Sequence, residues 1–282
     1  MDVQIARTLD GALAYLAAHP EAEPIAGGTD LMVEINFGRR RPERVVAVDR
    51  LEELMDLTAN GSVRMGSGVT YTRMLRSDGL PPALTQAART VGSPQIRNAG
   101  TLGGNLGTCS PAGDTLPVLA ALDATVVLRS TRGERRMPFG EYMTGPKKSA
   151  RRQDELVIAA EWADPGPSSV FMKAGTRNAM VIAVASLALV IDRARRRVGV
   201  ALGSCGPTII RAADAERHAQ GVLEEKGWER TLVPSDAALA EIGRLVAAAA
   251  RPIDDVRGTA AYRRHVLAVM AQRAFARAAL LA

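Results

Sequence analysis

The chain has 282 residues, of which 47% are hydrophobic and 23% are charged, and this length suits about two domains of roughly 100–200 residues each. The composition excludes a disordered tail, a collagen-like repeat and a disulfide-stapled miniprotein. The longest apolar run, residues 179–191, is shorter than the roughly 18 residues that a membrane span requires. The N-terminal segment has no basic start and no apolar core, so we expect no secretory signal and a cytoplasmic protein.

The formal net charge is +6, with basic clusters at 39–41, 147–152 and 193–197. Such charge attracts nucleic acids or acidic protein partners. Only four tyrosines and four phenylalanines are present, and none alternates with the basic runs as a base-stacking surface would require. We therefore expect solvated loops, some of them contacting an acidic subunit, and no nucleic acid.

The cysteines and histidines indicate no metal centre. Cys109 and Cys205 form no CxxC motif, and an iron–sulfur cluster usually needs four thiolates. The three histidines are far apart and show no zinc-binding spacing. We expect no metal and no cluster in this chain.

The N-terminal half shows clear local patterns. In chain order they predict a helix at 9–18 capped by Thr8, a strand–turn–helix unit at 24–32, a buried strand at 45–48, a hairpin at Asn60–Gly61 and helices at 71–76 and 82–91. The glycine-rich stretch from Gly92 to Gly113 shows neither helical nor strand periodicity, and we expect it to be irregular and functional. A helix at 115–122, a strand at 125–130, a hairpin back along 135–139 and a strand at 156–162 follow.

Residues 164–169 (DPGPSS) are the best candidate for a linker, so we place a domain boundary near residue 165. Beyond it, three strands are predicted at 170–174, 181–191 and 198–202. Three helices are predicted at 212–220, 235–250 and 259–281.

Two Gly-Gly turns, at 26–30 and 101–105, could bind an anion. Glycine permits positive φ and close approach of a ligand, and successive N–H groups can form a nest for a phosphate. The first turn also opens a helix, whose N-terminus favours negative charge. Two such turns suit a pyrophosphate and hence a dinucleotide, although either could be only a tight turn. The GxGxxG and GxxxxGK[ST] fingerprints are both absent.

Three segments carry a family resemblance: PIAGGTDLM (24–32), the run 96–124 with TLGGN and SPAGD, and FMKAGTRNAMVIAVASLAL (171–189). Together they resemble the FAD-binding subunit of the molybdenum hydroxylases, the family of xanthine dehydrogenase and aerobic carbon monoxide dehydrogenase. YRRHVLAVMAQRAF (262–275) resembles that family's closing helix. The resemblance implies an α+β fold: a two-subdomain FAD-binding domain of the vanillyl-alcohol-oxidase (PCMH) type at 1–165, with subdomains of about 1–55 and 56–165. A small domain of a three-stranded sheet and helices follows at 166–282.

The resemblance also implies cofactor-binding residues. Those expected to wrap the FAD pyrophosphate are Pro24, Ile25, Ala26, Gly27, Gly28, Thr29, Asp30, Leu31, Thr101, Leu102, Gly103, Gly104 and Asn105. Val91, Val157 and Ile158 are expected as apolar contacts, although ordinary core residues would look the same.

Two charged residues match polar FAD contacts of the family. Asp114 matches an acid that contacts the cofactor, but it could equally cap the following helix. Lys173 matches a lysine that reaches across from the small domain; otherwise it would be a surface lysine. Near the flavin N1/C2 carbonyl it would stabilise the anionic reduced ring. We expect non-covalent FAD, because no histidine lies near either glycine segment and Cys109 is best interpreted as a small buried thiol.

The function implied by the resemblance is a division of labour. A large molybdopterin subunit oxidises the substrate, a small [2Fe–2S] subunit relays electrons, and this chain passes them from FAD to NAD+, quinone or oxygen. The expected assembly is a heterotrimer or its dimer. The alternatives are a free-standing FAD oxidoreductase of the same fold, for which we find no acid–base pair, and a non-catalytic assembly protein, for which degraded glycine loops would be expected.

Overall fold

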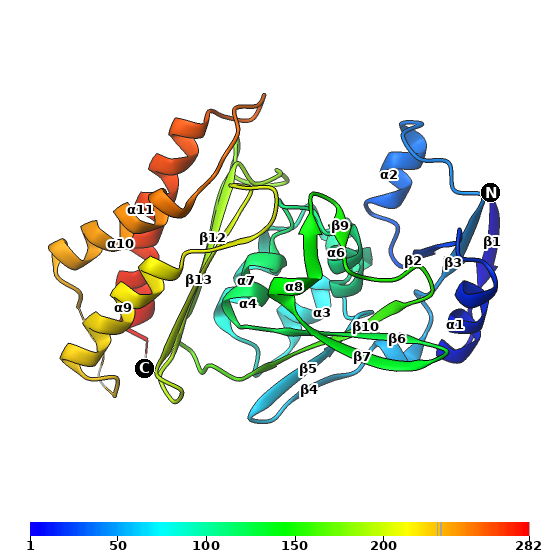
Figure 1. Ribbon diagram of the computed structural model, residues 1–282, viewed down its shortest axis with the longest axis horizontal. Helices are drawn as coiled ribbons and strands as arrows, with labels where there is room; N and C mark the ends of the chain where they lie inside the picture. Colours follow the sequence, from blue (N-terminus) through cyan, green and yellow to red (C-terminus); the bar gives the residue numbers. More distant parts are fainter. Residues whose placement is uncertain (230, 232, 282) are drawn as a thin grey trace.

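The computed structural model describes residues 1–229, 231 and 233–281 (Figure 1). Its helices are α1 (Leu9–Ala18), α2 (Leu31–Asn36), the 3-10 helix η1 (Glu52–Leu54), α3 (Tyr71–Arg76), α4 (Pro82–Thr90), α5 (Pro94–Ala99), α6 (Leu102–Thr108), α7 (Thr115–Ala121), α8 (Phe139–Tyr142), α9 (Ala213–Lys226), α10 (Asp236–Ala249) and α11 (Ala260–Ala279). Its strands are β1 (Asp2–Ile5), β2 (Glu23–Ile25), β3 (Arg44–Ala47), β4 (Leu57–Ala59), β5 (Ser62–Gly66), β6 (Thr125–Ser130), β7 (Gly133–Pro138), β8 (Met143–Gly145), β9 (Lys148–Ser149), β10 (Leu156–Ala163), β11 (Ser169–Ala174), β12 (Ala185–Asp192), β13 (Arg197–Gly203) and β14 (Ile210–Arg211).

The N-terminal sheet has three parallel strands in the order β1-β3-β2. Helix α1 begins at Thr8, whose hydroxyl accepts a hydrogen bond from the N–H of Gly11 at 3.1 Å. This cap stabilises the helix start by about 1 kcal/mol, and α1 matches its predicted bounds. At the end of β2 the chain enters the first glycine turn and then α2, so the predicted strand–turn–helix unit is confirmed.

The central sheet has five antiparallel strands in the order β4-β5-β10-β6-β7. The predicted Asn60–Gly61 hairpin joins β4 to β5, and Gly61 takes the positive φ of 69° that favours glycine there. The middle strand, β10, is buried along most of its length. Its pairing with β6 shifts register between Val157 and Ala159.

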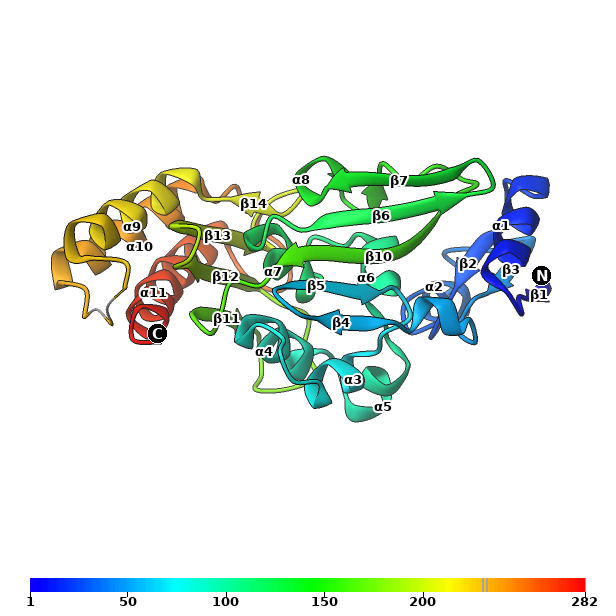
Figure 2. The same cartoon turned by 90° about the horizontal axis from the view of Figure 1, so that it is seen from below.

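The C-terminal sheet has the order β11-β12-β13-β14. We predicted three strands, and the structure adds the two-residue β14. One face packs on α4 and α7, and the other packs on α9 and α11 (Figures 1 and 2). Because both faces are covered, β12 is buried at every residue. Helix α9 runs to Lys226, six residues beyond its predicted end.

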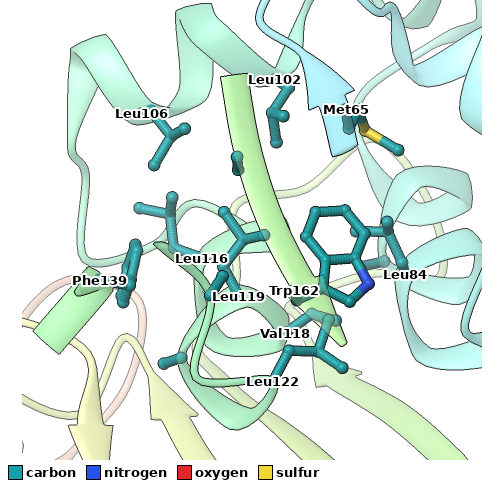
Figure 3. Packing of buried hydrophobic residues seen from close by; sticks show 14 of the residues in the cluster. Met65, Leu84, Leu102, Leu106, Leu116, Val118, Leu119, Leu122, Phe139 and Trp162 are labelled. Carbon is teal, nitrogen blue, oxygen red and sulfur yellow. The ribbon is translucent and has the colours of Figure 1, made fainter. Parts of the chain in front are cut away.

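The prediction that residues 92–113 are irregular is wrong, because this stretch contains α5 and α6. Ser93 and Thr101 are their N-caps, accepting from the N–H groups of Ile96 at 3.4 Å and Gly104 at 2.9 Å. Helix α6 contains three glycines, which disfavour helix. Burial of Leu102 and Leu106, i and i+4 on one side of the helix, compensates for this cost (Figure 3).

No helix in the described part of the chain combines the length and apolar character needed to cross a membrane.

Candidate functional site

The structure brings the two glycine segments together. A Cβ on Gly27 would lie 1.7 Å from the carbonyl oxygen of Ala99, two residues before Thr101. At the other end of α6, the hydroxyl of Thr108 donates to a carboxylate oxygen of Asp30 at 3.2 Å. Only glycine at position 27 permits this approach, so the segment 24–31 contacts the chain on both sides of the segment 101–105, at Ala99 and at Thr108.

The first turn has donors to offer a ligand. Among the described residues, no acceptor takes the N–H groups of Gly27, Gly28, Thr29 and Asp30. Gly28 has a φ of +67°, and the side chain of Asp30 does not cap α2. Consecutive free N–H groups form a site for an anion such as a phosphate, as the sequence predicts for this turn.

The second turn is different. The N–H of Leu102 donates to the Val69 oxygen at 3.0 Å, that of Gly103 to the Ser67 oxygen at 2.7 Å, and that of Gly104 to the Thr101 hydroxyl at 2.9 Å. The expectation of a second nest from these N–H groups is therefore wrong. Gly103 is required for packing instead, since a Cβ there would lie 2.6 Å from the Ser67 Cβ. Gly104 is exposed, so direct contact of 101–105 with a cofactor stays a prediction.

A buried ion pair joins the C-terminal sheet to the N-terminal half. The Nζ of Lys173 lies 2.6 Å from Asp114 Oδ2, with side-chain exposures of 8% and 5%. Lys173 also donates to the Thr90 carbonyl at 3.2 Å, and the Thr90 hydroxyl donates to Asp114 Oδ2 at 3.0 Å. Burial raises the pKa of Asp114, against the opposing effects of Lys173 and Thr90. Lys173 is thus no surface lysine.

The other oxygen of Asp114 is available to a ligand. Asp114 precedes α7 but makes no side-chain cap, because its own backbone is helical. Its Oδ1 is buried and has no hydrogen-bond partner among the described residues. A buried carboxylate oxygen without a donor is costly, so a donor from a bound molecule would stabilise this arrangement.

Polar side chains that the sequence did not single out connect this pair to the glycine turn. Burial, and then the carboxylates of Asp114 and Asp30, raise the pKa of Tyr71. The Thr115 hydroxyl donates to Asn105 Oδ1 at 2.6 Å and orients that amide. Thr115 directly follows Asp114 in the sequence, but Tyr71 lies 43 residues earlier and belongs to no motif, so only the fold reveals that it lies near Asp114.

The three predicted apolar contacts lie in the core. Val91 is half-buried after α4 and packs against the cluster in Figure 3. Val157 is 7% exposed and belongs to that cluster, whereas Ile158, at 5%, belongs to the cluster around α1. This is the ordinary-core interpretation that the sequence left open, and any contact of these residues with a cofactor stays a prediction.

Both cysteines are buried and free. Burial raises the pKa of each thiol to about 12. Cys109 ends α6 with a φ of 52° and packs in the central core. Within the described part of the chain, no group of three or more histidine, cysteine, aspartate or glutamate side chains could hold a metal.

Comparison with known proteins identifies the family. Residues 1–161 match the FAD binding domain in molybdopterin dehydrogenase, and residues 170–278 match the CO dehydrogenase flavoprotein C-terminal domain. The nicotinate dehydrogenase FAD-subunit of Eubacterium barkeri is 37% identical over 63% of this chain and 64% of its own length. The xanthine dehydrogenase FAD-binding subunit of Escherichia coli O157:H7 is 33% identical over 76% and 77%.

A solved structure agrees over the full length. Reconstituted CO dehydrogenase from Oligotropha carboxidovorans contains a chain with a TM-score of 0.90 and 25% identity, and the match covers 100% of this chain and 98% of that one. The resemblance found in the sequence is therefore confirmed. This chain belongs to the family of FAD-binding subunits of the molybdenum hydroxylases, and it carries their FAD-binding domain.

Proposed function

We propose that this chain is the electron-transfer subunit of a three-subunit dehydrogenase. In it, a small [2Fe–2S] subunit delivers electrons to this chain, which passes them to NAD+, a quinone or oxygen, while a large molybdopterin subunit oxidises the organic substrate. The division of the chain near residue 165, with subdomains of about 1–55 and 56–165, is part of this proposal. The observation that carries it is the presence, in one chain, of N–H groups at Gly27–Asp30 and of a buried Asp114 Oδ1 that have no hydrogen-bond partner among the described residues.

These groups fit a dinucleotide flavin held without a covalent bond. The N–H groups of the first turn would hold the pyrophosphate, with the segment 24–31 on one side and 101–105 on the other. Asp114 Oδ1 would accept a hydrogen bond from a sugar-type hydroxyl. Bound FAD supplies the capacity to accept two electrons and release them to an acceptor.

Lys173 acts here together with Asp114. Its ammonium group is already paired at 2.6 Å, so the pair presents little net charge to the cofactor. We infer that its first task is to keep Asp114 ionised and its second oxygen oriented as an acceptor. The carboxylate of Asp114 compensates part of the positive charge of Lys173. Only the remaining charge can stabilise an anionic reduced flavin ring.

The side chains at the site support a subunit rather than a self-sufficient oxidase. The only buried acid and base that meet among the described site residues, Asp114 and Lys173, are bonded to one another. They leave no free pair for proton abstraction from a substrate. The relatives are named as subunits of nicotinate and xanthine dehydrogenases, which supports partners that carry the substrate chemistry.

The test begins with the visible absorption spectrum of the chain purified alone and identification of the cofactor released by mild denaturation. We expect a flavin spectrum and free FAD. An Asp114→Asn variant should bind FAD more weakly, whereas Asp10→Asn, at an 82% exposed side chain, should bind it normally. A colourless protein that takes up no added FAD would refute the proposal and leave a non-catalytic assembly role.

A further inference from the structure

The helical layer over the C-terminal sheet is incomplete at its edge strand. Helix α11 lies against β12 and β11, and α9 lies against β13 (Figure 2). On this face of β11, Val170 is 1% exposed, but Met172 and Ala174 are only half-buried. Between these two residues and α11 lies a groove of about 510 Å³, where a further helix of the layer would be expected.

Helix α11 presents a continuous stripe to this groove. The stripe consists of Tyr262, His265, Val266, Val269, Met270 and Arg273. Their spacing of three and four residues places them on one side of the helix, as in a helix that packs against a neighbour. The stripe spans about 17 Å at ~1.5 Å per residue, or three turns. Gly243 of α10 meets Ala268 and Gln272 of α11, which are not part of the stripe, and within the described chain the groove is lined only by residues of β11 and α11.

The groove combines an apolar floor with a polar rim, on which Arg273 carries a positive charge. Val266, Val269 and Met270 form the floor together with Met172. His265 and Arg273 are exposed at the rim, and no aspartate or glutamate lines the groove within the described chain. Lys173 lines it too, but its ammonium group is bonded to Asp114. An occupant should therefore be apolar on one side and acidic along its edge.

We propose that this groove receives an amphipathic helix, with acidic residues beside its apolar face, from a partner subunit. Helices commonly bind by laying an apolar face into such a groove. An occupant of this kind would extend the layer of α9 and α11 across β11. The inference rests on the proposed function, since it assigns a docking surface within the multisubunit assembly.

The test is chemical footprinting of His265 with diethyl pyrocarbonate, on the chain alone and in the purified three-subunit complex. We expect His265 to react in the free chain and to be protected at least tenfold in the complex. His19, the C-cap of α1, which lies at the other end of the molecule from α11 (Figure 1), should react equally in both. Unchanged reactivity of His265 in a complex that contains FAD would overturn the docking surface but leave the proposed function intact.

Variants locate the contact. Arg273→Glu and Val269→Glu should each weaken assembly at least tenfold without changing the FAD content. Arg264→Glu, on the same helix but outside the stripe, and Val256→Glu, at a fully exposed residue, should assemble normally. Equal effects of the stripe variants and the control variants on assembly would refute the inference. So would protection of His265 in the free chain if that protection increased with protein concentration, because the occupant of the groove would then be a second copy of this chain. A chain with neither FAD nor partners would refute the proposed function, and this inference with it.

Discussion

Substituting Gly27 by alanine tests whether the two glycine segments bind one ligand together. The added Cβ would lie 1.7 Å from the Ala99 oxygen and 2.3 Å from its carbonyl carbon, whereas ordinary contact begins at 3.4 Å. Both atoms belong to backbone, so no side chain can rotate away. The turn and the end of α5 must separate by well over 1 Å.

The size of the effect follows from where the strain falls. Gly27 lies in an exposed turn, so the free protein can relax by separating the two segments at a small cost in stability. Binding of a ligand to both segments would force them together again. Overpacking of this kind costs about 1–3 kcal/mol, which corresponds to an affinity for FAD lowered about 5–150-fold.

The assay is titration of the flavin-free protein with FAD, followed by flavin fluorescence, together with urea denaturation. The control is Gly221→Ala in α9, where a Cβ would meet nothing within 4 Å. This change should raise the free energy of unfolding by about 0.5–1 kcal/mol and leave FAD affinity unchanged. Wild-type affinity in Gly27→Ala would show that the two segments do not bind the cofactor jointly.

Three further predictions concern charge and burial. Lys173→Met leaves Asp114 as a buried acid without its cation and should lower the free energy of unfolding at pH 7 by about 3–5 kcal/mol. Because burial raises the pKa of Asp114, this loss should be smallest near pH 4 and should grow as pH rises. A double variant, Asp114→Asn/Lys173→Met, that recovers none of the lost free energy of unfolding in urea denaturation would contradict this prediction. Hydrogen bonds from Arg257, and then from the buried Arg263, lower the pKa of Asp255. The stability that the ionised Asp255 contributes to the fold should therefore be lost as pH falls below about 4. Asp255→Asn should lower the free energy of unfolding at pH 7 by about 1.5–3 kcal/mol, whereas the control Asp10→Asn should change it little. Both thiols, with pKa values raised to about 12, should resist iodoacetamide at pH 8 in the native protein and react after unfolding, and labelling of native Cys109 would show that it is less buried than the structure has it.

Local signals in the sequence were sufficient for many of the elements. Thr8 and Thr70 cap α1 and α3 through their hydroxyls, and both helices match their predicted bounds. Helices α5 and α6 were missed because both are short and because glycines lie on either side of α5 and within α6, which outweighs the signal of their caps. What stabilises α6 is contact of Leu102 and Leu106 with the central core, and that contact is not encoded within the segment.

The candidate site was predictable only in part, for the same physical reason. A pair of glycines shows that close approach of backbone is needed, but not whether a ligand or another strand approaches. Gly103 meets Ser67, which lies in a turn far back in the chain, and only the tertiary fold shows that its N–H group is already used. Likewise, nothing near Asp114 in the sequence shows that Lys173, 59 residues later, is its partner.

Strand β11 connects the candidate site to the proposed docking groove. Side chains alternate between the two faces of a strand, so Phe171 and Lys173 point toward α4 and α7, while Met172 points toward α11. The residue that holds Asp114 therefore lies between two residues that line the groove, Met172 and Ala174. A helix bound in the groove would pack against the strand that positions Lys173, so the proposed docking and the orientation of Asp114 would depend on the same three residues.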